Sequence, residues 1–560
     1  MKTHWQYLPE VKDSSTLAEQ ILFGRGFSKE EAEYFTNANY TTGLNDPLLL
    51  SGMKTAVKRI MQARVSKEKL VIYGDYDIDG ITASALLYDF FTQIGITVET
   101  YIPDRFSEGY GINKSALKKL KDQAADLVIT VDCGVNSAVE ADYAKKIQLD
   151  LIITDHHEPI GKKPSALAVI NPKLSGQEYP FKELAGVGVA FALVRAIIAL
   201  HPGIVPEGQE KWLLDLVALG TICDVVPLIN ENRILARYGL MVAQKGRRPG
   251  FRALAKVSGT DLNKVSETDF GFRFGPRLNA AGRVDHAKVG LATLLAETEA
   301  VADDCAQKLQ LLNTERQATT AEILASASKK ARAHKQDCIL VLSDPNWSHG
   351  TVGIVASNLS EKLRKPTILL QELGESAKGS ARSLGNFSII EAIESASGYL
   401  DKFGGHHFAA GVTLPTENIP AFRHAINQYG MKNLNVEDIL KTYTIDAVLS
   451  PDTISKESYD EIRLLAPYGN AHPQPLFAST LEIFSLRPIG KDLNHLKLQL
   501  RGDNKIFSAI AFSKAIAWKE LKVGEKYDFA YYINENEWQG VREIQLELVD
   551  VIITTANKKE

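Results

Sequence analysis

Aspartates stand at the ends of several apolar runs in this chain. The runs are "VIYGDYDIDGITAS" (71–84), "LVITVD" (127–132), "LIITD" (151–155) and "LVALGTICDVVPL" (216–228), and the aspartates are Asp75, Asp77, Asp79, Asp132, Asp155 and Asp224. In an open parallel sheet, ligands bind beyond the carboxyl ends of the strands. We therefore expect these carboxylates to share one site. One such aspartate alone would more often cap a helix or form a turn, but four clusters on successive strands favour a site whose mutual repulsion a cation relieves.

The stretch "TDHHE" adds His156 and His157 to these carboxylates. Imidazole beside carboxylate, without thiolate, favours Mn²⁺ or Mg²⁺ over structural zinc. Two such ions can activate water and stabilise the leaving oxygen of phosphodiester hydrolysis. On an extended stretch, Asp75, Asp77 and Asp79 would share one side. Three ligands from five residues are crowded, so Asp77 and Asp79 are the preferred ligands and the role of Asp75 stays open.

The cysteines next to two of these aspartates are read as core residues. Cys133 follows Asp132 and Cys223 precedes Asp224, and neighbouring residues of a strand point to opposite faces.

The elements that must position these residues follow from hydrophobic patterning. From about residue 66 to 230, apolar runs alternate with amphipathic stretches, which predicts strands buried on both faces of a parallel α/β sheet. Residues 291–336 contain no Gly and no Pro, so they should form one long connecting helix or two helices end to end; a helical bundle core is the alternative. A second α/β pattern runs to about 430, and short period-two strands then predict a small barrel or sandwich.

Composition limits the broad class. The chain has 560 residues, 45% hydrophobic and 24% charged, with a net charge of −4. No apolar run approaches the ~18 residues of a membrane span, and the start lacks the apolar core of a signal peptide, so we expect a cytoplasmic protein. The four cysteines show no paired spacing, which argues against disulfides and structural zinc. The negative charge argues against a generic nucleic-acid coat but allows a local basic groove.

Taken together, these motifs resemble a known family. "DYDIDG", the isolated Asp132, "DHH" (155–157) and Asp224 resemble the DHH phosphoesterases. Within them, "GPRLNAAGR" (275–283), "SHGTVGIVAS" (348–357), "GSARS" (379–383) and "FGGHHFAAG" (403–411) resemble the RecJ family of single-strand-specific exonucleases. The match runs in order from residue 70 to about 475. One departure is that the last motif carries His407 and Phe408.

The resemblance implies the domain organisation. An N-terminal segment (1–65) would pack on a parallel-sheet DHH domain (66–285). A connecting helix (286–336), a smaller α/β DHHA1 domain (337–435) and an all-β, OB-like nucleic-acid-binding barrel (436–560) would follow.

The resemblance also implies an activity: metal-dependent hydrolysis of single-stranded DNA from 5′ to 3′, releasing mononucleotides, in recombination and repair. The implied metal ligands are Asp77, Asp79, Asp132, Asp155, His156 and Asp224. Asp132 would bridge two ions, and His157 would contact a ligand or the scissile phosphate. The implied partner is single-stranded DNA, and single-strand-binding protein and a helicase are candidate protein partners. We expect no membrane association and a monomeric chain.

Polar residues of the same motifs are candidates for phosphate contact. Arg binds phosphate through two parallel bonds, and glycines let backbone amides approach it; for each Arg alone, a surface ion pair is the alternative. The candidates are Arg105, Arg277, Asn279, Arg283, Arg316, Gln317, His349, Ser380, Arg382, Ser383, Gly404, Gly405 and His406. A further glycine pair, in "LAGVGVAF" (184–191), should only open a helix and pack closely.

The last domain is rich in aromatics, which either stack bases or fill the core. They include Trp518, Tyr527, Phe529, Tyr531 and Tyr532, and residues 441–560 hold 15 Lys/Arg against 17 Asp/Glu. Two rival functions remain open. One is a DHH phosphodiesterase for short oligonucleotides or cyclic dinucleotides, which would need neither the barrel nor the N-terminal segment. The other is a non-catalytic replication scaffold, which would not need these carboxylate clusters.

Overall fold

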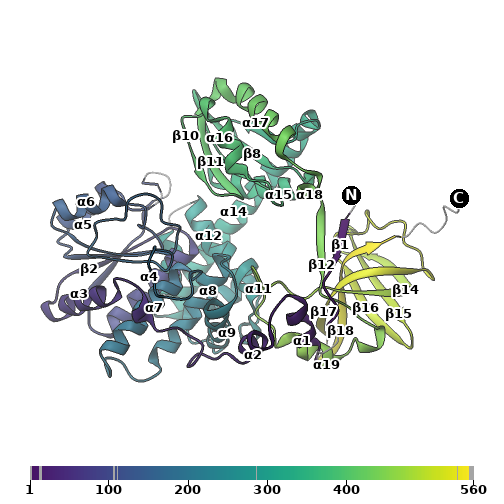
Figure 1. Cartoon of the computed structure of the whole chain (residues 1–560), viewed down its shortest axis with the longest axis horizontal. Coiled ribbons are helices and arrows are strands. Elements are labelled where there is room, and N and C mark those ends of the chain that lie inside the picture. The colour runs from purple at the N-terminus through teal and green to yellow at the C-terminus, as the bar shows by residue number, and fades with distance from the viewer. Residues whose placement is uncertain are drawn as a thin grey trace.

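Three bodies make up the chain in a computed structural model that describes residues 3–11, 16–104, 108–109, 111–284, 287–538 and 540–553. A parallel sheet with its helices lies at the lower left of Figure 1, a smaller mixed sheet at the top and a barrel at the right. This arrangement confirms the predicted fold class. No helix within the described ranges is long and apolar enough to span a membrane.

The first body is built on a five-stranded sheet in the order β3-β2-β4-β5-β6, with every pairing parallel. Alternate residues of the strands face opposite layers: Ile72 and Ile129 pack under α3, α4 and α7, whereas Val71 and Val128 pack under α5 and α6. The elements are α3 Met53–Ser66, β2 Leu70–Gly74, α4 Ile78–Gln93, β3 Val98–Tyr101, α5 Lys114–Asp122, β4 Leu127–Val131, α6 Ala138–Lys146, β5 Asp150–Thr154, β6 Ala168–Ile170 and α7 Gly186–Leu200.

A helical layer completes this body. Its helices are α8 Leu214–Cys223, α9 Asn230–Ala243, α10 Pro249–Ser258, α11 Glu267–Asp269, α12 Gly275–Val284 and α13 Lys288–Leu294. The residues before Asp224 therefore form a helix, whereas their apolar run predicted a strand. Continuous apolar runs do not distinguish a buried strand from a buried helix, and α8 is buried on all sides between α4, α7 and α9.

The connection to the second body is a single long helix, α14, Glu299–Ala331, which begins where the Thr298 hydroxyl accepts a hydrogen bond from the Val301 amide. At 1.5 Å per residue it is about 50 Å long. The second sheet has the order β10-β11-β9-β8-β7, in which only the β7–β8 pair is parallel. Its elements are β7 Leu340–Asp344, α15 His349–Leu363, β8 Thr367–Leu373, β9 Ser376–Arg382, α16 Ile389–Ser395, β10 Lys402–Gly405, β11 Ala409–Pro415, α17 Ile419–Asn433 and α18 Val436–Ile439.

The third body is a closed barrel. Neighbouring strands pair in the order β14-β15-β16-β18-β17, and β17 pairs again with β14. Strand β12, Lys441–Ile445, leads into it from the second body. The other elements are β13 Ala447–Val448, α19 Lys456–Arg463, β14 Phe477–Ile489, β15 His495–Gly502, β16 Lys505–Ala511, β17 Lys526–Trp538 and β18 Val541–Ile552.

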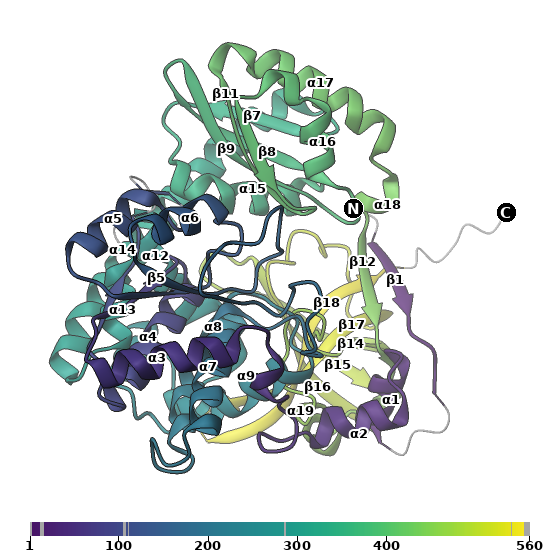
Figure 2. The ribbon, with the colours of Figure 1, turned by 60° about the vertical axis from the view of Figure 1, so that its left-hand side comes forward.

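The N-terminal segment departs from expectation. Strand β1, Thr3–Tyr7, pairs in parallel with β12 beside the barrel (Figures 1 and 2). Helices α1, Leu17–Gly24, and α2, Lys29–Asn37, bury Ile21, Leu22 and Phe35 in the same core as Phe477 of the barrel. From about residue 40 onward the segment packs on the parallel-sheet body. Helix α2 also contacts α9 of that body, where the Arg233 guanidinium lies 4.0 Å from the Phe35 ring centroid and donates to the Phe35 carbonyl at 3.3 Å. The prediction that residues 1–65 pack on the DHH domain is thus wrong for β1 and α1, which pack on the barrel, whereas α2 packs between the barrel and α9.

Candidate functional site

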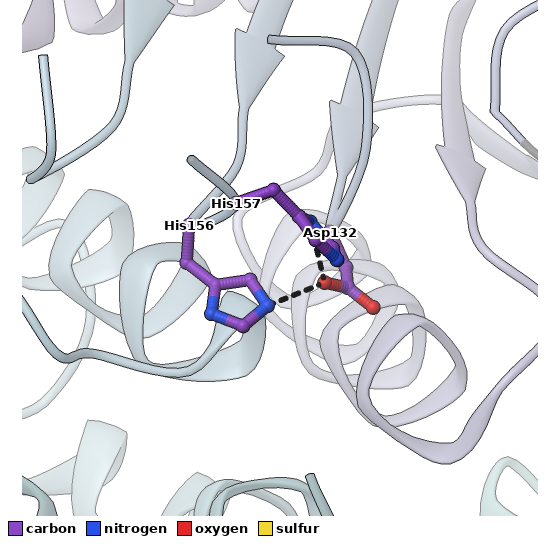
Figure 3. A group of neighbouring side chains, drawn as sticks. All are labelled: Asp132, His156 and His157. Carbon is purple, nitrogen blue, oxygen red and sulfur yellow. Dashed lines mark ion pairs between the residues drawn. The ribbon is translucent and has the colours of Figure 1, made fainter. Parts of the chain in front are cut away.

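The carboxyl ends of β2, β4 and β5 bring the predicted ligands to one place. Three groups have side-chain donor atoms within 4.8 Å of one another: Asp132 with His156 and His157, Asp79 with His156 and Asp224, and Asp75 with Asp77 and Asp132. Figure 3 shows Asp132 pointing at the two imidazole rings. Asp132 and His156 each belong to two groups, so the three groups form one continuous cluster.

Asp132 lies at the centre of the cluster in an unusual backbone conformation. It follows β4 with φ of +60°, a left-handed geometry that Asp adopts more readily than most residues with a side chain. Its neighbour across the site is Gly186, the first residue of α7, where a Cβ would lie 2.7 Å from the Asp132 side chain. The Asp132 carboxylate thus fills the space between the turn after β4 and the start of α7, and a side chain at position 186 would collide with it.

Two acceptor atoms face each other at this centre. Asp132 Oδ1 lies 3.0 Å from His156 Nε2, and neither atom has a hydrogen-bond partner among the described residues. Burial, and then the nearby His157, lowers the pKa of His156 to about 3, so the ring is neutral at neutral pH. The backbone hydrogen bond of this ring is to Leu184; we assign it to Nδ1, which leaves a lone pair on Nε2. A divalent cation between the two atoms would satisfy both.

Asp79 is held by the start of a helix. It lies in the first turn of α4, and its two oxygens accept hydrogen bonds from the Gly186 and Val187 amides of α7, at 2.6 and 2.9 Å. Burial, and then the charge of Asp77, raises the pKa of Asp79 to about 7. Burial and the surrounding carboxylates also raise the pKa of Asp132 and of Asp224. Such repulsion in a buried site indicates a cation partner. The two amides of "AGVG" were not predicted, because a glycine pair that opens a helix usually serves only packing.

An extended stretch was predicted for the three aspartates of "DYDIDG", but they lie at the turn into α4 and in its first residues. Asp77 is the N-cap of α4, and its Oδ1 accepts hydrogen bonds from the Asp79 and Gly80 amides at 3.0 and 3.1 Å. The turn into the helix still gathers Asp75 and Asp77 around Asp132. Gly80 permits this turn, since a Cβ there would lie 2.6 Å from the Asp75 backbone.

Asp155 lies after β5 and is held by several hydrogen bonds. Its Oδ1 accepts hydrogen bonds from the His156 and His157 amides and contacts His157 Nδ1 at 2.7 Å, while its Oδ2 accepts from the Val135 amide. A carboxylate offers about two acceptor positions on each oxygen, so these contacts satisfy Oδ1 fully and Oδ2 in part. Burial opposes ionisation, but these bonds and the His157 charge hold the pKa of Asp155 below its usual range. These contacts let Asp155 position His157, and its role as a metal ligand stays a prediction.

Asp224 enters the cluster from the end of α8. As the residue that follows this helix, it places Oδ2 3.6 Å from His156 Nε2, with no hydrogen-bond partner within the described part of the chain. Cys223 beside it contacts the Phe270 carbonyl through Sγ, and Cys133 is fully buried. Lys173, which was not predicted, lies close enough to oppose part of the rise in the pKa of Asp224 that burial and the neighbouring carboxylates cause.

Helix α12 links this cluster to the second body. The side-chain oxygen of Asn279 accepts a hydrogen bond from the Ile78 amide at the start of α4, at 3.0 Å. One turn further, Arg283 donates to the Gly350 carbonyl at the start of α15, at 3.2 Å. A Cβ on Gly353 of that helix would lie 3.2 Å from the Arg382 guanidinium and 3.3 Å from the Ser380 hydroxyl. A chain of direct contacts therefore runs from the carboxylates to the predicted phosphate-binding residues of β9.

The remaining phosphate candidates lie around this path. Arg277 Nε donates to Gln310 at 2.8 Å, and Arg316 donates to the buried Asn313 at 2.8 Å, while the buried Arg316 Nε has no partner within the described residues. Burial lowers the pKa of Arg316 and of Arg382. His349 begins α15, Gln317 is exposed on α14, Ser383 donates to the Phe387 carbonyl, and Gly404, Gly405 and His406 are exposed on β10 and the turn after it. Arg105 lies outside the described residues.

The aromatics expected to stack bases are mostly core. Trp518, Tyr527, Phe529 and Tyr531 are buried inside the barrel, and Tyr532 is half-buried. The Tyr531 hydroxyl is hydrogen-bonded to the Ser479 hydroxyl at 2.7 Å. Of the two readings of these aromatics, the structure supports the core.

The donor set fits divalent cations. It consists of carboxylates and neutral imidazole, it lacks thiolate, and Asp132 Oδ1, His156 Nε2 and Asp224 Oδ2 are buried without a hydrogen-bond partner among the described residues. Such oxygen-rich sites with imidazole suit Mn²⁺ and Mg²⁺. Because Asp132 and His156 are each shared between donor groups, the cluster can hold two adjacent ions.

Comparison with protein-family models divides the chain in the same order. Residues 69–221 match the DHH family, N-terminal domain; residues 336–432 match the DHHA1 domain; and residues 445–550 match the RecJ OB domain.

Similar proteins cover nearly the whole chain. The single-stranded-DNA-specific exonuclease RecJ of Bacillus subtilis (strain 168) is 36% identical over 98% of this chain and 69% of its own length. The protein of the same name from Escherichia coli (strain K12) is 34% identical over 89% of each chain. Among solved structures, RecJ from Thermus thermophilus in complex with Mn²⁺ matches with a TM-score of 0.83 at 29% identity, covering 99% of this chain and 80% of that one. The structure of the same protein with Mg²⁺ matches with a TM-score of 0.76.

Proposed function

Because the chain belongs to the RecJ family of single-stranded-DNA-specific exonucleases, we propose that it hydrolyses single-stranded DNA from the 5′ end, releasing mononucleotides, in recombination and repair. The observation that carries the proposal is the buried pair of acceptors, Asp132 Oδ1 and His156 Nε2, 3.0 Å apart among carboxylates. Asp77, Asp79, Asp132, His156 and Asp224 would hold two Mn²⁺ or Mg²⁺ ions, with Asp75 beside them. When bound, the ions supply an activated water and neutralise charge on the scissile phosphate.

The residues of the chain itself position the substrate. Asp155 accepts from the His157 ring and so fixes its orientation at the rim of the cluster, where the imidazole can donate to a phosphate oxygen. Arg283, Arg382 and Ser380 line the path into the second body, and they would hold the phosphates that follow the scissile one. Arg316 would add a further contact through its unpartnered Nε. Positioning and charge neutralisation supply most of the catalysis of such reactions.

The direct test is digestion of 5′-labelled substrates with added Mn²⁺ or Mg²⁺. Single strands and 5′-tailed duplexes should be degraded and blunt duplexes left intact, and Asp132→Asn should remove the activity. Cleavage of dinucleotides alone would favour the phosphodiesterase for short substrates. Binding without cleavage of any substrate would favour the non-catalytic scaffold.

The proposal extends to the setting of the enzyme. A single chain carries both the cluster and the phosphate-binding path, which supports a monomer. An enzyme restricted to single strands depends on activities that expose them, which supports a helicase and single-strand-binding protein as partners. A DNA substrate supports a place in the cytoplasm. The domain limits proposed for it are 66–285, 286–336, 337–435 and 436–560.

A further inference from the structure

The turn after β6 brings a lysine to the metal cluster. Strand β6 pairs in parallel with β5, and the amide of Asp155, the residue after β5, donates to the Ile170 carbonyl at the end of β6, at 3.0 Å. The carboxyl ends of these two strands therefore lie at the end of the sheet where the carboxylates gather. Lys173 follows β6 by three residues, so the fold places it at this same end.

A buried asparagine joins this turn to the histidine pair. The Asn171 side chain is fully buried, and its Nδ2 donates to the His157 carbonyl at 2.9 Å while its Oδ1 accepts from the Lys173 amide at 2.8 Å. A buried amide side chain that moved away would leave several polar groups without partners. Asn171 therefore fixes the backbone of Lys173 relative to that of His157.

The ammonium group of Lys173 lies between two glutamates that flank the cluster in the sequence. Its Nζ is 3.1 Å from Oε1 of Glu158, the residue after His157, and 3.8 Å from Oε2 of Glu183, three residues before the start of α7. The lysine side chain is 17% exposed, whereas the two glutamates are 62% and 45% exposed. Ion pairs with exposed carboxylates contribute little, and an ammonium group has three donors, so Nζ can turn to an incoming anion at small cost.

Lys173 acts on the open side of the cluster. Asp79 and Asp132 are buried, whereas the side chains of His157 and Asp224 are 37% and 21% exposed. A substrate therefore reaches the cluster from the side of His157 and Asp224. Burial and the neighbouring carboxylates raise the pKa of Asp224, and the charge of Lys173 opposes part of this rise, so the lysine is close to this side.

The lysine and the arginines of the phosphate path approach the cluster from different sides. Arg283 belongs to α12, whose Asn279 accepts from the Ile78 amide at the start of α4, after β2. Lys173 follows β6, and strands β4 and β5 separate β2 from β6 in the sheet. A phosphodiester at the cluster would therefore lie between cations on two sides.

We propose that Lys173 is a positioning residue for the substrate: its ammonium group leaves the two glutamates and donates to a non-bridging oxygen of the phosphodiester beside Asp224. The inference rests on the proposed function and adds a residue to its substrate site. A cation at this place has opposite effects on the two ligands of the site, because it attracts the anionic phosphate and repels divalent ions. A lysine that only linked the loops of Glu158 and Glu183 would have neither effect.

The test measures Mn²⁺ binding and strand digestion on the same samples of the intact chain. In Lys173→Met, calorimetry without DNA should show Mn²⁺ bound about 3–10-fold more tightly than in wild type, since a repelling charge is removed. At saturating Mn²⁺, kcat/KM for an oligothymidylate should fall about tenfold or more, since a charge-assisted contact to phosphate is lost. Lys173→Arg keeps the charge, so it should bind Mn²⁺ as wild type does and recover most of kcat/KM.

Two matched variants separate the role of the charge from general and structural effects. Lys162→Met makes the same change of net charge at an exposed residue of the loop between β5 and β6, and should match wild type in both measurements. Glu158→Gln/Glu183→Gln removes the two ion pairs but leaves the lysine charged, so its kcat/KM should stay within about threefold of the wild-type value.

Three results would overturn the proposal. One is unchanged or weaker Mn²⁺ binding by Lys173→Met, and another is a wild-type kcat/KM in this variant. The third is an equal loss of kcat/KM in Glu158→Gln/Glu183→Gln, which would show that the lysine serves only to link the two loops. Failure of the wild type, with Mn²⁺ bound, to digest any single strand would instead refute the proposed function.

Discussion

Replacing Asp79 by Asn should stabilise the metal-free protein at neutral and alkaline pH, although it removes a proposed metal ligand. Asp79 is fully buried, and burial followed by the charge of Asp77 raises its pKa from 3.8 to about 7. Between these pH values the folded protein keeps a proton at Asp79 that the unfolded chain releases. Stability therefore falls as the pH rises from about 4 to about 7. Asn has no such proton, so the variant escapes this loss.

The size of the effect follows from the same shift. One unit of pKa shift corresponds to about 1.4 kcal/mol. The Asp79 carboxyl group therefore lowers the free energy of unfolding of the metal-free protein by about 4 kcal/mol near pH 8 and by roughly 1–2 kcal/mol near pH 5. Asn offers one acceptor oxygen where Asp79 accepts from both Gly186 and Val187, and the lost bond costs about 1–3 kcal/mol. That loss does not depend on pH. The stability of the variant relative to wild type should therefore increase by about 3 kcal/mol between these pH values.

The assay is thermal unfolding of both proteins in EDTA near pH 5 and near pH 8. For a domain of this size, about 1 kcal/mol shifts Tm by roughly 2–4 °C, so the gap should widen by roughly 6–12 °C. Asp122→Asn, at an exposed helix position paired with Lys118, serves as the control and should show no such trend. With Mn²⁺ the order should reverse, because only the wild type gains the full binding energy. A gap that stays constant or narrows as the pH rises would refute the reasoning.

Four further variants test other parts of the structure. Arg382→Ala should raise the KM for single strands with kcat nearly unchanged, and kcat/KM, measured against NaCl, should depend less on salt than in wild type by roughly 0.7 in log–log slope; an unchanged slope would remove Arg382 from phosphate contact. In Gly186→Ala the new Cβ would lie 2.7 Å from the Asp132 side chain, and Asp155→Asn weakens the hydrogen bond to the His157 ring. Each variant should lower the Mn²⁺ affinity or kcat by about 10–100-fold, measured by calorimetry and single-strand digestion. Wild-type values in both variants would contradict the described geometry. Phe35→Ala should destabilise the barrel by about 3–5 kcal/mol in a denaturant titration while a very short oligonucleotide is still cleaved, and loss of that cleavage would show that the N-terminal helices support the metal site as well.

The sequence was sufficient to predict the parallel sheet and most of the cluster. Apolar runs that end in aspartate locate the carboxyl ends of β2, β4 and β5, and those ends meet in any parallel sheet. What the pattern cannot show is the conformation of the few residues after each strand. Asp77 caps α4 because its side chain accepts hydrogen bonds from the first amides of that helix. Asp155 makes four hydrogen-bond contacts to neighbouring groups. Both outcomes depend on hydrogen bonds that no spacing rule records.

Contacts between distant segments were also beyond the sequence. The apolar faces of α1 and α2 could pack on any of the three bodies. They pack on the barrel, whose core residues lie more than 400 positions later in the sequence. The Arg25–Asp446 ion pair of 2.7 Å joins the same two parts of the chain. For the aromatics of the barrel the sequence left two readings open, core or base stacking, and only the folded strands show that Phe529 and Tyr531 lie in the core. Asp224 was correctly placed near the other carboxylates although a strand was predicted before it, because the end of helix α8 also lies at the cluster.

The most direct test of the central claim is a Mn²⁺ titration by calorimetry, with single-strand digestion measured on the same samples of wild type and Asp132→Asn. Asp132 belongs to two of the three donor groups, so its replacement should weaken both ions at once. We predict two bound Mn²⁺ per wild-type chain together with digestion of single strands. For the folded variant, we predict loss of at least one ion and a fall in kcat of at least about 100-fold. Two tightly bound Mn²⁺ and near-normal digestion by Asp132→Asn would contradict the account.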